Sequence, residues 1–175
     1  MYEYTDRAIK YLDRRYIRMF GQLGTLASFD ELNVTASVRS LYRELERLTR
    51  DIFLRIARRA YERADGPGSL DAEWVDALLA GYDPVTKYVF SHEVERKAAR
   101  FAEALIASRQ APAEVKTALR LWSRMAREYA VRVTREATKK ALTDRGVQRW
   151  RWHTLDGGAC SICAGRNGRV WRPED

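Results

Sequence analysis

The sequence contains few of the residues that interrupt helices. Only 4 prolines and 10 glycines occur among 175 residues, and most of the glycines lie outside the stretches with helical periodicity. Because proline and glycine mark breaks and turns, this scarcity predicts long helices joined by short loops. No apolar run approaches the roughly 20 residues that a membrane-spanning helix needs. We therefore expect no membrane segment.

Cysteine and histidine are also scarce, with two of each. The N-terminal stretch MYEYTDRAIK has no apolar core of a signal peptide, so we expect a chain that is not secreted. Two cysteines in such a chain do not make a disulfide framework. The sequence has no Ser-His-Asp set, phosphate-binding loop, dinucleotide fingerprint or paired-carboxylate pattern. We predict that the protein is not an enzyme and has no small-molecule substrate.

Positive charge is what the sequence has in excess. Its 32 Lys and Arg residues exceed the 24 Asp and Glu residues, which gives a formal net charge of +8. Such a field favours contact with nucleic acid or with an acidic protein surface. Arginine is also a good helix former that is common on solvated helix faces. Charge alone therefore leaves both interpretations open.

Apolar residues recur three and four positions apart in several stretches, which is the spacing of a buried helical face. The stretches predict helices over 5–23, from a cap at Asn33 or Thr35 to about 64, and over 70–79, 83–108 and 113–145. In the helix over 83–108 we expect Asp83 to be the N-cap and Pro84 to take the first helical position. At 1.5 Å per residue the last helix would be roughly 50 Å long.

The periodicity changes at Gly146. The stretch VQRWRWHTL alternates as a strand does, and Asn167-Gly168 is a turn signal before a second short strand over 169–171. The predicted fold class is therefore mainly α. We expect an elongated bundle of long helices over 1–145, followed by a small C-terminal β-hairpin or knuckle over 146–175 that contains the C-x-x-C.

Two interpretations of Cys160 and Cys163 are open. Their spacing lets two thiolates face one zinc ion, and His153 is the nearby third candidate. A tetrahedral site needs a fourth ligand, and a set completed by Asp156 would be atypical. The alternative is a pair of small thiols packed under the tryptophans. We favour the packed thiols, and then expect no cofactor.

The C-terminal segment also contains candidate contacts to nucleic acid or a partner. Tryptophans interleaved with arginines can stack on bases and hold phosphates. The candidate residues are Arg149, Trp150, Arg151, Trp152, Arg166 and Arg169. Alternatively the tryptophans cover the end of the long helix, because so small a β element needs one buried face. We favour this second interpretation.

A family resemblance rests on three stretches in this order: YDPVTKYVFSHEVERKAARFAEAL, TALRLWSRMAREYAVRVTREATKKAL and GVQRWRWHTLDGGACSICAGRNGRVW. Together they resemble tailed-phage minor head proteins, the head morphogenesis family, over roughly residues 80–172. In that family a mainly helical body is followed by a strand, a TLD step, a C-x-x-C and a glycine turn. The matching positions are Trp152, Thr154, Leu155, Asp156, Cys160, Cys163, Gly168 and Val170.

The resemblance implies a structural, low-copy component of the virion head, assembled in the bacterial cytoplasm near the portal or inner capsid. Its implied partners are the portal protein, the major capsid protein or both, with packaged DNA nearby, and it implies no catalytic residue. Relatives commonly continue into a second motif with His-Pro and another Cys, which would complete a metal site, whereas this sequence ends at RPED. The alternative function is a basic nucleic-acid-binding module that uses the C-terminal Trp/Arg hairpin.

Overall fold

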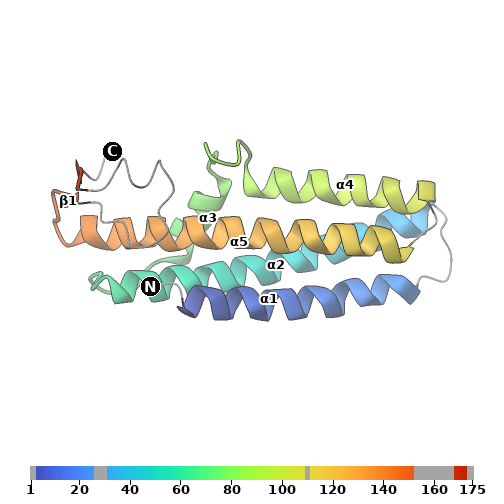
Figure 1. The fold of residues 1–175 in the computed structure, drawn as a ribbon, viewed down its shortest axis with the longest axis horizontal. Helices are drawn as coiled ribbons and strands as arrows, with labels where there is room; N and C mark the ends of the chain where they lie inside the picture. The colour runs from blue at the N-terminus through green and yellow to red at the C-terminus, as the bar shows by residue number, and fades with distance from the viewer. Residues whose placement is uncertain (1–2, 26–30, 109–110, 152–167, 173–175) are drawn as a thin grey trace.

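Four long helices pack side by side in an elongated bundle (Figure 1). The structure is a computed structural model that describes residues 3–25, 31–108, 111–151 and 168–172. Its elements are α1 (Glu3–Gly21), the 3-10 helix η1 (Gln22–Thr25), α2 (Glu31–Arg63), α3 (Ala72–Ala80), α4 (Phe90–Ser108), α5 (Ala111–Asp144), β1 (Trp150–Arg151) and β2 (Val170–Trp171). The long helices alternate in direction, and the short α3 lies between α2 and α4 in the chain (Figure 1). The prediction of a mainly α protein is confirmed.

The predicted apolar stripes form the core of the bundle. On α1 the residues Leu12, Tyr16 and Met19 are buried, as the three-four spacing predicts. The stripe of α5 is buried from its middle onward: Trp122, Ala126, Tyr129, Val133 and Ala137. No helix among the described residues has the length and apolar character required to cross a membrane.

Aromatic rings from all four long helices meet in the core. The Trp122 ring of α5 lies 5.5 Å from Tyr16 of α1 and 5.4 Å from Tyr42 of α2, measured between centroids. Farther along α5, the Tyr129 ring lies 4.9 Å from the Phe90 ring of α4 in an edge-to-face arrangement. Such pairs add about 0.5–1.5 kcal/mol to the burial of the rings, and through them α5 contacts each of the other three long helices.

Buried hydroxyl groups fix how α1 sits against its neighbours. The Thr5 and Thr134 hydroxyls are 3.1 Å apart, and Thr134 also donates to the carbonyl of Ala130. The Tyr16 hydroxyl lies 2.6 Å from the Thr49 hydroxyl of α2. Burial raises the pKa of Tyr16, so this hydroxyl stays neutral. A sliding of α1 would separate the buried hydroxyls of Thr5 and Tyr16 from these partners, and a buried hydroxyl without a partner costs about 1–3 kcal/mol.

Several predicted helix details are wrong. The helix α2 begins at Glu31, before Asn33 or Thr35, because buried Val34 extends its apolar stripe toward the N-terminus. In α3, which begins at Ala72, the buried residues are Val75 and Leu79, and Trp74 and Leu78 are partly buried. The N-cap of α3 is Asp71, whose carboxylate accepts a hydrogen bond from the amide of Glu73. A short helix has too few turns for its sequence to identify the inner face.

The predicted C-terminal β-hairpin is not supported and is corrected here. Across the described residues, β structure after α5 is limited to two antiparallel residue pairs, in which Trp150 lies opposite Trp171 and Arg151 opposite Val170. A pairing this short is marginal in water unless a core supports it. The described core ends at Ala141, and Val170 is exposed, so the described part of this segment does not pack as a hairpin would. Alternation of apolar and polar residues over only a few positions is too weak a pattern to predict a packed β-hairpin.

Truncation of Trp122 tests the core. We predict that Trp122→Ala lowers the free energy of unfolding by about 3–5 kcal/mol, because the side chain is fully buried among rings of α1 and α2. Leu121→Ala is the matched control, since Leu121 is the adjacent residue and is exposed. Urea unfolding of both variants measures the difference. Equal stability of the two would mean that α5 is not packed as described.

Candidate partner-binding groove

Residues 82–89 form a structured loop, which corrects the prediction that α4 begins at Asp83. The buried Asp83 carboxylate accepts hydrogen bonds from the Val85 amide at 3.1 Å and from the Thr86 hydroxyl at 3.0 Å. The backbone closes the loop through Asp83 N to Tyr88 O at 3.0 Å. Aspartate followed by proline favours a turn, because Pro84 fixes φ for its second position. Asp83 therefore caps a turn instead of a helix.

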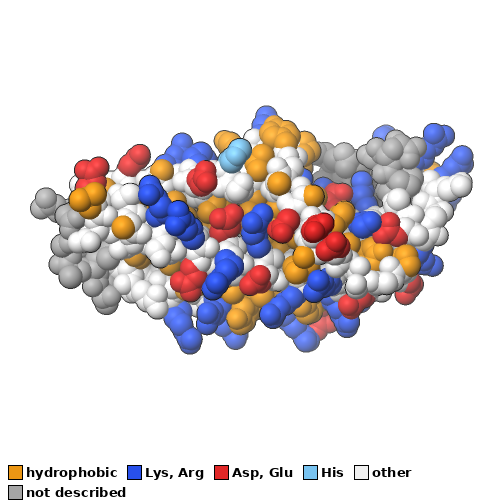
Figure 2. Space-filling model, turned by 180° about the vertical axis from the view of Figure 1, so that it is seen from behind, with side chains coloured by type: hydrophobic (Ala, Val, Ile, Leu, Met, Phe, Trp, Pro, Cys, Tyr) orange, Lys and Arg blue, Asp and Glu red, His pale blue; other side chains and the backbone are white. Residues whose placement is uncertain are grey.

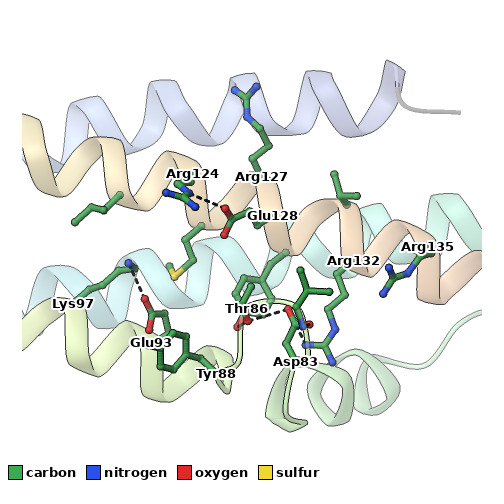
Figure 3. A pocket seen from close by; sticks show the side chains of 15 residues that line it. Asp83, Thr86, Tyr88, Glu93, Lys97, Arg124, Arg127, Glu128, Arg132 and Arg135 are labelled. Atoms are coloured by element: carbon green, nitrogen blue, oxygen red, sulfur yellow. Dashed lines mark hydrogen bonds and ion pairs between the residues drawn. The ribbon is translucent and has the colours of Figure 1, made fainter. Parts of the chain in front are cut away.

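The cation Arg132 of α5 fastens this loop to the bundle. Its Nη1 lies 3.8 Å from Oδ2 of Asp83, and its Nη2 donates to the carbonyl of Tyr82 at 3.4 Å. Figure 3 shows Arg132 reaching from α5 toward Asp83. The loop also contains Lys87 at φ 61, a left-handed conformation that costs a non-glycine residue roughly 1–2 kcal/mol. The contacts at Asp83 and Arg132 offset that cost.

A network of three charges holds the start of α4. The buried carboxylate of Glu93 accepts hydrogen bonds from Arg96 at 2.7 Å and forms an ion pair with Lys97 at 2.8 Å. Burial raises the pKa of Glu93, but the hydrogen bonds from Arg96 and Lys97 outweigh burial and leave the pKa below its usual value. The Arg96 guanidinium also lies 4.9 Å from the centre of the Tyr88 ring. These contacts link the loop to α4 as well as to α5.

The loop, α4 and α5 enclose an open groove of about 640 Å³. Its floor contains the buried Met125 and Tyr129 of α5. The loop and the start of α4 form one wall, and the outer face of α5 from Leu121 to Arg135 forms the other. Figure 3 shows Asp83, Glu93 and Lys97 on the side of the loop and α4, and Glu128 and Arg132 on α5, whereas Arg127 points away from the loop and α4. The groove therefore exists because residues 82–89 fold back onto α5.

The groove combines cations with exposed apolar side chains. Its lining contains five cations and three carboxylates: Lys97, Arg124, Arg127, Arg132 and Arg135 with Asp83, Glu93 and Glu128. Large apolar side chains that are exposed also gather here, namely Val85, Tyr88, Leu121 and Val131. On the face shown in Figure 2, cationic side chains likewise alternate with hydrophobic and acidic ones. This composition suits recognition of another molecule more than proton transfer or bond cleavage.

None of the sequence-predicted site residues that the structure describes lines this groove. His153, Cys160 and Cys163, together with Trp152 and Arg166, lie outside the described residues. Arg149, Arg151 and Arg169 are exposed near the β1–β2 pair, and Trp150 belongs to β1. Within the described ranges no group of three His, Cys, Asp or Glu side chains could hold a metal ion. His92 is exposed on α4.

The groove could not be predicted from the sequence, because Asp83 and Arg132, which hold the loop in place, both occur in patterns typical of ordinary helices. Asp83 looked like a helix cap, and Arg132 looked like one more surface cation of α5. The Asp83-Pro84 pair was the available signal for a turn. Arg132 contacts the carbonyl of Tyr82, which lies 50 positions earlier in the sequence. No local sequence pattern predicts such a contact.

Comparisons with protein-family models, with curated proteins and with solved structures find no match to this chain.

The Glu93 network gives a pH-dependent prediction. A carboxyl whose folded-state pKa is below its ordinary value of 4.5 stabilises the fold above that pH and loses this contribution as the pH falls through the folded-state pKa. Glu93→Gln should therefore lower the free energy of unfolding by about 1.5–3 kcal/mol at pH 7. The difference in the free energy of unfolding between Glu93→Gln and the parent protein should become smaller below about pH 4.5. Glu95→Gln, at an exposed position of the same helix, is the control. A difference that does not change with pH would refute the role given to this carboxylate.

Proposed function

We propose that this protein is a structural minor head protein of a tailed phage or prophage. In this role it binds other head proteins near the portal or inner capsid and lies close to packaged DNA. It performs no reaction and needs no cofactor. The observation that carries the proposal is the ordered set of three stretches over residues 82–171, which ends in the TLD step and the C-x-x-C.

The position of the groove supports this proposal. The first resembling stretch, residues 82–105, supplies the loop and α4, and the second, residues 117–142, supplies most of α5. Every residue that lines the groove belongs to one of these two stretches. The two stretches of the body that resemble head proteins therefore together form this groove.

The helical body is suited to a structural role. Four long helices share one aromatic core, so the bundle can bear a load along its length without a hinge between its described helices. Its net charge of +8 favours acidic neighbours, which in a phage head include both DNA and acidic protein surfaces.

Particle composition tests the proposal. Heads should be purified by density gradient from the bacterial strain that carries the gene, after prophage induction or phage infection. We expect peptides of this chain to co-sediment with the major capsid protein, at low copy number, and deletion of the gene to reduce the yield of filled heads. The absence of the chain from purified heads, with unchanged particle yield, would refute a head function.

DNA binding separates this proposal from the nucleic-acid-binding alternative. For a head protein adjacent to packaged DNA, we expect weak binding that falls steeply with salt and has no base-sequence preference. Binding with a sequence preference, lost when Arg149 and Arg151 are replaced by alanine, would instead favour a module that uses the C-terminal segment. Gel-shift titrations over a range of salt concentrations measure both properties.

A further inference from the structure

We propose that the groove between the 82–89 loop and α5 binds an acidic amphipathic helix of a partner protein. The proposal rests on the groove itself and does not require the head function. The expected partner helix has apolar residues along one face and carboxylates that flank them.

Apolar side chains are exposed on both walls of the groove. Val85 is 78% exposed, and Leu121 and Val131 are each 43% exposed, on opposite walls of the same hollow. Exposed apolar side chains that cluster and have a polar rim mark interaction sites. The loop that presents Val85 and Tyr88 is fixed by its hydrogen bonds, so these side chains point outward in a held conformation. A partner would not have to order the loop, which lowers the entropic cost of binding.

The charges of the groove favour a ligand that has carboxylates. Each of its three carboxylates already has partners: Glu93 with Lys97 and Arg96, Glu128 with Arg124, and Asp83 with the loop and Arg132. Arg127 has no ion pair with any described residue. Arg135 pairs only with its chain neighbour Glu136 in that set, an exposed pair of little energetic value. Arg135, and Arg127 at the outer edge of the α5 wall, are therefore available to a ligand's carboxylates.

The shape of the groove favours a helix. The α5 wall runs from Leu121 to Arg135, and a helix rises 1.5 Å per residue, so the wall is about 21 Å long. Along this wall, Leu121 and Glu128, and likewise Arg124 and Val131, are seven residues apart and lie on one face. A helix of about four turns can lie against such a face by ridges-into-grooves packing, with its apolar residues as anchors.

A nucleic acid is less suited to the same surface. Glu128 stands midway along the α5 wall, where it would repel a phosphate backbone. The aliphatic side chains Leu121 and Val131 offer no stacking surface for bases. An amphipathic helix can cover these side chains and place an uncharged residue opposite Glu128.

The experiment is a peptide selection followed by affinity measurements. A display library of random peptides of about 16 residues, long enough for four helical turns, is selected against the full chain. We expect enriched peptides with apolar residues spaced three and four apart and Asp or Glu beside them. Fluorescence anisotropy then measures their Kd for groove variants and for controls with the same change elsewhere.

The charge variants are Arg127→Glu and Arg135→Glu, each compared with Arg120→Glu, the same change at an exposed cation of α5 outside the groove. The apolar pair is Val131→Ser against Ile17→Ser, an exposed residue of α1. Groove variants should weaken binding by about tenfold or more, and controls by less than about twofold. All these positions are exposed, so thermal melts should stay close to the parent protein's.

Three results would overturn the proposal. The selection can yield no saturable binder, or peptides without acidic enrichment. The selected peptides can bind equally well to the groove variants and to the controls. Duplex DNA can displace the bound peptides and lose its own affinity in Arg127→Glu and Arg135→Glu but not in Arg120→Glu, which would assign the groove to nucleic acid. A negative result for head association would leave the peptide measurements unaffected, so the two proposals fail separately.

Discussion

The edge-to-face contact between Phe90 and Tyr129 is the interaction on which the functional surface depends. It joins the first residue of α4 to the middle of α5, and Phe53 of α2 packs against the same Phe90 ring. Because Phe90 is fully buried there, the preceding segment must leave the bundle core and return along α5. The loop over 82–89 is the result, and the Asp83–Arg132 contact holds it in place. Core packing thus determines where the groove lies.

This arrangement separates stability from recognition within one helix. The inner face of α5 contains Trp122, Tyr129 and Val133, which are fully buried. The outer face of the same turns contains Arg124, Arg127 and Val131, which are exposed. Side chains on the outer face contribute little to the core, so a partner surface there can change without loss of the fold. A structural protein that must fit a particular neighbour benefits from that separation.

The sequence allowed prediction of the helices but not of the loop that shapes the groove. Stripes such as Leu12–Tyr16–Met19 identify a helix and its inner face together, because many turns report the same periodicity. The segment from Asp83 to Val89 has only seven residues, about two helical turns, and its conformation depends on Arg132, far along the chain. The predicted C-terminal hairpin failed for a related reason, since a few alternating residues cannot show whether a core lies beneath them. For Cys160 and Cys163 the zinc and packed-thiol predictions both stand, because those residues lie outside the described ranges.

The central claim is that the 82–89 loop is held on α5 in the free protein, so the groove exists before any partner binds. Amide hydrogen exchange of the full chain tests this residue by residue. The amides of Asp83, Val85 and Lys87 donate within the loop and should exchange at least about tenfold more slowly than an unstructured chain. Arg132→Gln should remove much of that protection while the amides of the α5 core stay protected. Exchange of all three loop amides at unstructured rates in the parent protein would contradict the account.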